Sequence, residues 1–126
     1  MSWQAYVDDN LIGTGKITKA AILGQQGGVW ANSAGYDLPA SEQSALAQAF
    51  TDPATAQASG VRAAGQKFFC IGANDRSVYG KKQADGIVVV KTTQAILVAE
   101  YSHPTLPGEA TKIVEQLADY LINVGY

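Results

Sequence analysis

The chain contains few of the residues on which enzymes and metalloproteins depend. Its 126 residues include one cysteine, Cys70, and one histidine, His103. A single cysteine cannot form an internal disulfide, which is typical of a protein from a reducing compartment. A nucleophilic serine or cysteine needs a base beside it, and a metal ion needs several clustered ligands. Neither pattern occurs in the sequence, so we expect no catalytic site, no metal and no cofactor.

Long apolar runs and a strong charge of either sign are also missing. No stretch approaches the ~20 apolar residues of a membrane span, and residues 1–6 lack the basic and apolar regions of a signal peptide. The formal net charge is -2, whereas nucleic-acid binding needs a strongly basic surface. We therefore expect a cytoplasmic chain with no nucleic-acid partner.

One short segment faintly resembles a phosphate-binding loop. Gly13-Thr14-Gly15-Lys16 ends in the expected glycine and lysine, but the first glycine of the motif is missing. Ile17 stands where a serine or threonine would hold magnesium, and the segment follows a predicted helix rather than a strand. We therefore assign no nucleotide binding to it.

What is present predicts one α+β domain over residues 1–126, with 47% apolar and 16% charged residues. Helical spacing of apolar residues and helix-boundary residues predict helices at about 2–10, 40–51 and 109–124. Strands are expected at 16–23, 29–33, 66–73, 77–81, 87–92 and 95–101. Short connections between successive strands favour antiparallel pairing. The apolar stripe of the last helix is expected to pack on the resulting sheet, with the first helix beside it.

Aromatic residues gather near the two ends of the chain and in the second predicted strand. They are Trp3, Tyr6, Trp30, Tyr120 and Tyr126. If both terminal helices pack on one face of the sheet, these rings converge. An exposed aromatic groove suits proline-rich segments, whose extended helix loses little entropy on docking. The spacing alone, however, favours the simpler interpretation that the rings fill the core between the helices.

Four segments resemble the profilin family, especially its fungal members. They are SWQAYVD at 2–8, GQKF at 65–68, DRSVYG at 75–80 and GEATKIVEQLADYL at 108–121. The resemblance implies an α+β, profilin-like fold, in which a central antiparallel sheet carries the N- and C-terminal helices on one face and shorter helices on the other. It also implies that the five aromatic residues bind proline-rich segments of formin-like proteins.

The resemblance further implies a second face that binds monomeric actin. The matching positions are Lys67, Cys70, Gly72, Lys91, Gly108, Thr111, Lys112, Glu115 and Gln116. In the last helix, Lys112, Glu115 and Gln116 project away from the apolar stripe, so we expect them to be free to meet a partner; a plain solvated helix face is the alternative. The implied role is that of a monomeric protein at the actin cytoskeleton and cell cortex, which delivers actin monomers to filament barbed ends.

Basic residues are concentrated in the strand-rich half of the chain: Arg62, Lys67, Arg76, Lys81, Lys82 and Lys91. Basic residues near a membrane surface attract anionic lipid headgroups. Since profilins bind phosphoinositides, the resemblance makes Arg76, Lys81 and Lys82 candidates for headgroup contacts. Scattered charges that only aid solubility are the alternative.

Gly72 departs from the family pattern, because many profilins carry an arginine at this position. A glycine supplies no charge and no side-chain donor, so actin and lipid binding are expected to be weaker. One alternative function is therefore a proline-peptide adaptor with weak or no actin binding. Another is a small enzyme on the same fold, against which the lack of a catalytic constellation counts. Cys70 lies in an apolar run, and we expect it to be buried or half-buried.

Overall fold

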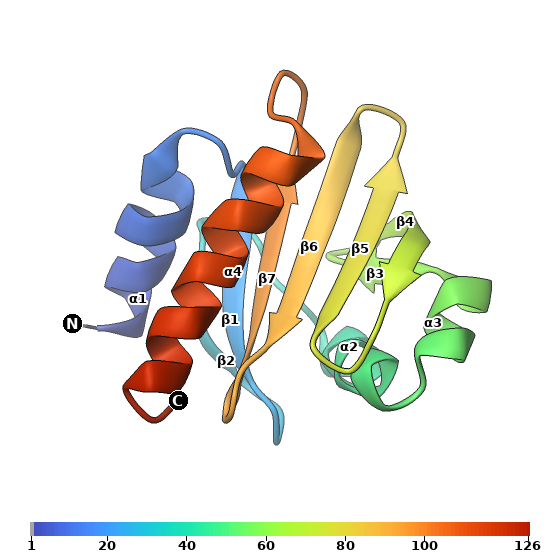
Figure 1. Cartoon of the computed structure of the whole chain (residues 1–126), viewed down its shortest axis with the longest axis horizontal. Helices are drawn as coiled ribbons and strands as arrows, with labels where there is room; N and C mark the ends of the chain where they lie inside the picture. Colours follow the sequence, from blue (N-terminus) through green and yellow to red (C-terminus); the bar gives the residue numbers. More distant parts are fainter. Residues whose placement is uncertain (1) are drawn as a thin grey trace.

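The computed structural model describes residues 2–126, which form a curled antiparallel sheet with helices on both faces (Figure 1). Within these residues the sheet has seven strands in the order β2-β1-β7-β6-β5-β4-β3. The first strand, β1, pairs with the last, β7, in antiparallel register from Lys19 opposite Glu100 to Gly24 opposite Ala95. The strands are β1 (Lys19–Gly24), β2 (Val29–Asn32), β3 (Val61–Ala63), β4 (Gln66–Ala73), β5 (Ser77–Lys82), β6 (Asp85–Lys91) and β7 (Ala95–Tyr101).

The two ends of the chain cover one face of the sheet. The N-terminal helical segment consists of α1 (Trp3–Ala5), the π-helix η1 (Tyr6–Leu11) and the 3-10 helix η2 (Ile12–Thr14). Figure 1 shows this segment beside α4 (Pro107–Asn123), with both lying over the sheet. Val7, Leu11, Val114 and Leu121 are fully buried between these helices and the strands. Burial of their apolar surface anchors both chain ends to one core.

The opposite face is covered by α2 (Ala40–Thr51) and α3 (Pro53–Ser59). Leu46 and Phe50 of α2 pack with Phe68 and Val89 of the sheet in a second core. The sheet is therefore buried on both sides along its central strands, which explains why β7 is apolar at almost every position.

The sequence-based fold prediction is confirmed in its class and layers, and several bounds agree. Helix 40–51 and strands 66–73 and 95–101 have the predicted limits. The predicted helix 2–10 is α-helical only over Trp3–Ala5 and continues as a π-helix. The strand predicted at 87–92 instead spans Asp85–Lys91, because the turn before it consists only of Gln83 and Ala84.

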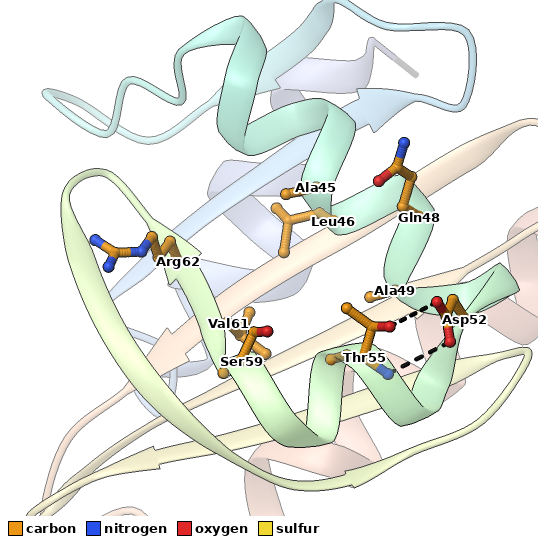
Figure 2. Close-up of a pocket in the computed structure, with 11 residues that line it drawn as sticks. Ala45, Leu46, Gln48, Ala49, Asp52, Thr55, Ser59, Val61 and Arg62 are labelled. Carbon is orange, nitrogen blue, oxygen red and sulfur yellow. Dashed lines mark hydrogen bonds between the residues drawn. The ribbon is translucent and has the colours of Figure 1, made fainter.

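Two elements, α3 and β3, were not predicted. Asp52 and Pro53 end α2 as expected, but they also begin the next helix. The Asp52 carboxylate accepts hydrogen bonds from the Thr55 backbone N–H at 3.4 Å and from its hydroxyl at 2.6 Å (Figure 2). Asp52 is the N-cap of α3, and Pro53 is its first residue. Proline is favoured at this position because the first backbone N–H groups of a helix have no intrahelical partner.

Among the described residues, no helix combines the length and the apolar character that crossing a bilayer requires.

Candidate functional site

The five predicted aromatic residues meet at one end of the molecule. The Trp3 ring lies 4.7 Å from that of Trp30, 5.6 Å from that of Tyr6 and 4.9 Å from that of Tyr126, measured between centroids. Tyr120 extends the group at 6.1 Å from Tyr6. Separations of this size are those of favourable aromatic pairs. The expected convergence is therefore observed, and we call these residues the aromatic cluster.

The aromatic cluster is only partly buried. Tyr120 is 49% exposed and Tyr126 is 41% exposed, while Trp3 and Trp30 are half-buried. Only Tyr6, at 9% exposed, fits the core-packing alternative. The cluster is thus a surface of rings, and a partner that covers it gains apolar contact area.

Local hydrogen bonds place the first tryptophan. The Ser2 hydroxyl accepts from the Ala5 backbone N–H at 3.1 Å and caps α1. The Gln4 side chain donates to the Asn32 carbonyl at 2.9 Å, which ties α1 to the end of β2. Trp3 is therefore held against the strand that carries Trp30.

The last residue is fixed in the same way. The Tyr126 carbonyl accepts from the Gln94 backbone N–H at 2.6 Å and from the Thr92 hydroxyl at 2.6 Å. The Gln94 side chain donates to the Gly125 carbonyl at 2.8 Å. These bonds hold the chain end on the β6–β7 turn and place the Tyr126 ring at right angles to that of Trp3.

A glycine makes room for the second tryptophan. A Cβ atom built at Gly24 would lie 2.7 Å from Trp30 Nε1, closer than atoms can approach without a shift. The indole of Trp30 therefore rests directly against the backbone of β1. Any side chain at position 24 has to displace it.

The Tyr6 hydroxyl is a hydrogen-bond donor at neutral pH. Hydrogen bonding with Tyr120, followed by burial, raises the pKa of Tyr6 above its ordinary value of 10.0. A protonated phenol can donate to the carbonyls of a proline-rich segment, which have no amide partners of their own.

A second surface lies on the opposite flank of α4. There, a hollow of about 430 Å³ is lined by Ile71, Tyr79, Tyr101, Pro107, Gly108, Thr111, Lys112 and Glu115. On β4 beside it, Phe69 is 74% exposed and Ile71 is 61% exposed. Lys81 pairs with Phe69 across the strands and lies 5.7 Å from the Tyr101 ring. We call the hollow together with Phe69 and Lys81 the β4 face.

The structure brings together only part of the predicted actin-binding set. Gly108, Thr111, Lys112 and Glu115 line the hollow of the β4 face. A Cβ atom at Gly72 would lie 3.5 Å from the Tyr79 ring, so this position borders the same hollow. Lys67 is exposed on β4, opposite Arg62 of β3.

Three members of the set lie elsewhere. The Lys91 amine lies 5.8 Å from the Phe50 ring, on the α2 side of the sheet. Cys70 is half-buried, as expected, and packs against the core on that same side. Gln116 lines a different hollow together with Tyr6 and Tyr120.

The expectation that Glu115 is free to meet a partner is wrong. Its carboxylate accepts from Arg76 Nε at 3.0 Å, from the Ser77 hydroxyl at 2.8 Å and from the Tyr79 hydroxyl at 2.9 Å. The donors come from the residue before β5 and from the first half of that strand, and helical periodicity alone does not show this contact. Burial raises the pKa of Tyr79, and the Glu115 carboxylate adds to this effect while Ser77 and Arg76 oppose it; because the pKa is raised, the hydroxyl stays protonated.

The expected grouping of Arg76 with Lys81 and Lys82 is also wrong. Arg76 forms ion pairs with Glu115 at 3.0 Å and Asp119 at 2.7 Å. It precedes β5, whereas the two lysines end that strand, so about five residues at ~3.3 Å each separate them. The lysines instead lie near the exposed edge formed by β3 and β4, where Lys82 contacts the Gln66 side chain. Arg76 and the two lysines therefore do not form one basic group.

Sequence reasoning missed Phe69 and Ile71, the most exposed apolar side chains of the β4 face. A signal was present in the run Phe68-Phe69-Cys70-Ile71, where side chains alternate between the two faces of one strand. Phe68 is buried in the α2 core, so its neighbours had to face the other side. Nothing in the local sequence reveals that α4 stops short of covering them.

A small hollow on the far face of the sheet shows no feature of a binding site. It encloses about 150 Å³ between α2, α3 and β3, with Leu46, Ala49 and Val61 at its base. Figure 2 shows Asp52 turned toward Thr55, and Arg62 extended away from Leu46. The Asp52 carboxylate already caps α3, and we assign no ligand to this hollow.

Known proteins resemble the chain along its whole length. The family model described as Profilin matches residues 1–126. The profilin of Schizosaccharomyces pombe is 54% identical over 127 residues and that of Saccharomyces cerevisiae 52%, with 100% of both chains covered in each case.

Solved structures agree with these relatives. Crystalline Schizosaccharomyces pombe profilin has a TM-score of 0.96 at 54% identity, with 99% of this chain and 100% of that chain covered. Mouse profilin IIa, in complex with a double repeat from the FH1 domain of mDia1, has a TM-score of 0.84 at 22% identity, with 100% of both chains covered; it shows the shared fold. The chain belongs to the profilin family, whose members regulate the assembly of actin.

Proposed function

We propose that this chain binds monomeric actin on its β4 face and proline-rich segments on its aromatic cluster, and thereby delivers monomers to filament barbed ends. The observation that carries the proposal is the aromatic cluster, where rings from both chain ends and from β2 meet on the surface. A monomer core has no need to leave Tyr120 and Tyr126 nearly half exposed.

The aromatic cluster suits a proline-rich ligand for physical reasons. Such a ligand already has the extended polyproline II conformation, so docking costs little conformational entropy. The flat rings of Trp3 and Trp30 offer apolar contact area, and the hydroxyl of Tyr6 stays protonated and can donate to proline carbonyls. The double FH1 repeat in the mouse profilin IIa complex is a fitting ligand class to test.

The β4 face suits a folded protein partner. Phe69 and Ile71 form an exposed apolar centre, and Lys81 and Lys112 lie at its margins. Protein interfaces of standard size have such a centre, and a few of its residues carry most of the binding energy. We assign monomeric actin to this surface, with Gly108, Thr111 and Lys112 as the contributions of α4.

The two surfaces lie on opposite flanks of α4, so both partners can bind at once. Linking a bound monomer to a proline-rich segment near a filament end raises the local concentration of the monomer there. No step of this function makes or breaks a covalent bond. We place the protein in the cytoplasm, at the actin cytoskeleton and cell cortex.

The proposal also includes lipid binding, with fewer contact residues than the sequence predicted. Lys81 and Lys82 end β5, and Lys82 contacts Gln66, the neighbour of Lys67 in β4. Each basic residue at an anionic surface contributes about 1 kcal/mol. Phosphoinositide headgroups are assigned to this end of the sheet. Because Lys81 also belongs to the β4 face, lipid and actin are expected to compete.

The alternative function is a proline-peptide adaptor with weak or no actin binding. It is favoured by Gly72, which supplies no charged side chain at the border of the β4 face. Under this alternative, proline peptides bind normally while monomeric actin binds weakly or not at all.

The test is a pair of titrations on the same variants. Decaproline is followed by tryptophan fluorescence, and labelled monomeric actin by anisotropy. Trp3→Ala is expected to weaken decaproline binding by ~1–3 kcal/mol and to leave actin binding unchanged. Lys112→Ala, on the opposite flank of α4, is the matched control and should keep full decaproline affinity. Failure of the wild-type protein to bind decaproline would disprove the aromatic cluster as a proline-binding site. Failure to bind actin would favour the alternative of a proline-peptide adaptor.

A further inference from the structure

The position of the Tyr126 ring depends on the turn that holds the chain end. The ring is 41% exposed and meets Trp3 edge-on, at 4.9 Å between centroids. Chain ends fray unless contacts fix them. Here the Tyr126 N–H donates to the Leu121 carbonyl of α4 at 2.8 Å, while Thr92 and Gln94 of the β6–β7 turn donate to its carbonyl. The residue therefore spans α4 and the turn, and a shift of the turn moves the ring.

The β6–β7 turn, residues 92–94, is itself held by one residue of the β1–β2 turn, residues 25–28. Figure 1 shows both turns at the end of the sheet where the chain ends. The Gln25 backbone N–H donates to the Gln94 carbonyl at 3.0 Å, and its side-chain amide donates to the Thr92 carbonyl. The first bond adds one step to the β1–β7 ladder and does not depend on the side chain. The second bond requires a glutamine at this position.

Thr92 connects the Gln25 amide to the chain end. It is only 4% exposed, and each of its polar groups is hydrogen-bonded. Its hydroxyl donates to the Tyr126 carbonyl at 2.6 Å and accepts from the Ala95 N–H at 2.9 Å. A buried carbonyl that loses its donor is costly. Removal of the Gln25 amide therefore forces the turn to rearrange or to admit water, and the Tyr126 carbonyl follows the Thr92 hydroxyl.

The β1–β2 turn is in its turn attached to α2, on the far face of the sheet. The Gln43 side chain accepts from the Gly28 N–H at 2.8 Å and donates to the Leu38 carbonyl at 2.7 Å. Gln25 thus acts from a turn that is fixed on both sides. It is half-buried, whereas its neighbour Gln26 is exposed and forms no side-chain hydrogen bond within residues 2–126. Two adjacent glutamines therefore differ in this one contact.

We propose that Gln25 is a positioning residue of the proline-binding site, because it fixes the Tyr126 ring through Thr92. The inference rests on the proposed proline-binding function and adds to it a residue from outside the aromatic cluster. A ring that is already held against Trp3 loses less conformational freedom when the ligand docks, which strengthens binding. Gln25 also lines a hollow beside Trp30, so direct contact with the ligand is the competing explanation.

The experiment is a double-mutant cycle between Gln25 and the Tyr126 ring. Gln25→Met keeps the length of the side chain but removes the donor, and Gln25→Asn keeps an amide that is one methylene too short to reach Thr92. Gln26→Met is the matched control. Each variant is made in the wild-type chain and in Tyr126→Ala, which removes the ring and keeps the carbonyl. Decaproline is titrated by tryptophan fluorescence, and near-ultraviolet circular dichroism without ligand reports the packing of Trp3.

Both Gln25 variants are expected to bind decaproline about threefold more weakly than the wild-type protein and to alter the near-ultraviolet spectrum, while Gln26→Met changes neither. In the Tyr126→Ala chain the same Gln25 substitutions should cause no further loss. Wild-type affinity of the Gln25 variants would overturn the inference, and so would a loss that persists without the Tyr126 ring, since it would indicate direct contact or general loosening. Both results leave the proposed function intact. Absence of decaproline binding to the wild-type protein would overturn both.

Discussion

The two flanks of α4 carry surfaces that are built in different ways. The aromatic cluster is assembled from distant parts of the chain, with Trp3 and Tyr126 in contact at 4.9 Å. The β4 face comes mostly from successive strands and the start of α4, and its apolar centre, Phe69 and Ile71, lies on one strand. The cluster therefore depends on how the chain ends are fixed, whereas the β4 face depends on which strand positions α4 leaves uncovered.

Charge separates the two surfaces as well. The five residues of the aromatic cluster are neither acidic nor basic. The β4 face contains Lys81 and Lys112, while Glu115 at its edge is held by internal hydrogen bonds. Binding to the β4 face should accordingly weaken as salt is added, and binding to the cluster should respond much less. The predictions below test this separation one surface at a time.

The largest effect is expected for Phe69→Asp. A charge in the exposed apolar centre of the β4 face should weaken binding of monomeric actin by about 2 kcal/mol, or roughly thirtyfold. Anisotropy with labelled actin measures this, with Gln57→Asp on exposed α3 as the matched control. Decaproline affinity should not change. An actin affinity within about twofold of the wild-type value would remove the β4 face as the interface.

Glu115→Ala should lower the free energy of unfolding by about 2 kcal/mol, because it leaves donors from Ser77, Tyr79 and Arg76 without their shared acceptor. Asp119→Ala should cost less than about 0.5 kcal/mol, since its ion pair with Arg76 is exposed to solvent. Urea denaturation of the two variants measures the difference. Equal losses would mean that the network at Glu115 contributes no more than a surface ion pair.

Gly24→Ala tests the aromatic cluster without removing a ring. The added Cβ has to displace Trp30, from whose Nε1 it would lie 2.7 Å, so decaproline affinity should fall about fivefold. Gly108→Ala is the matched control, because a Cβ there meets nothing within 4 Å. Fluorescence titration gives both affinities. An unchanged affinity in Gly24→Ala would show that the position of Trp30 is not critical.

The smallest effect is expected for Gly72→Arg, which should tighten actin binding about threefold. The backbone tolerates the change, since the nearest atom to an added Cβ is a Tyr79 ring carbon at 3.5 Å. The arginine would add a cation at the border of the β4 face. A parallel anisotropy titration decides the point, and an unchanged or weaker affinity would show that this border does not meet acidic groups of actin.

Periodicity predicted the fold well, because most elements bury one regular face. The stripe of α4 and the apolar run of β7 are signals of that kind. The helix α3 was missed because Pro53 after Asp52 has two meanings, the end of one helix and the start of the next. Only the hydrogen bonds between Asp52 and Thr55 distinguish them.

The candidate site was predictable to a different extent on each surface. All members of the aromatic cluster were named from the sequence, since rings at both chain ends converge once the terminal helices share a face. The environments of Glu115 and Arg76 could not be predicted, because their contact joins α4 to the residue before β5 across 39 positions of the chain. Long-range pairs of polar side chains leave no periodic trace in the sequence.

The anchoring of the chain end on the β6–β7 turn has a practical consequence for labelling. A fluorescent protein or affinity tag fused at Tyr126 would emerge beside Trp3, and one fused ahead of Ser2 would begin at the cap of the same helix. Either fusion would crowd the ligand it was meant to report. A dye attached to Gln57→Cys, in a Cys70→Ser background, would sit on exposed α3 across the sheet and leave both surfaces clear.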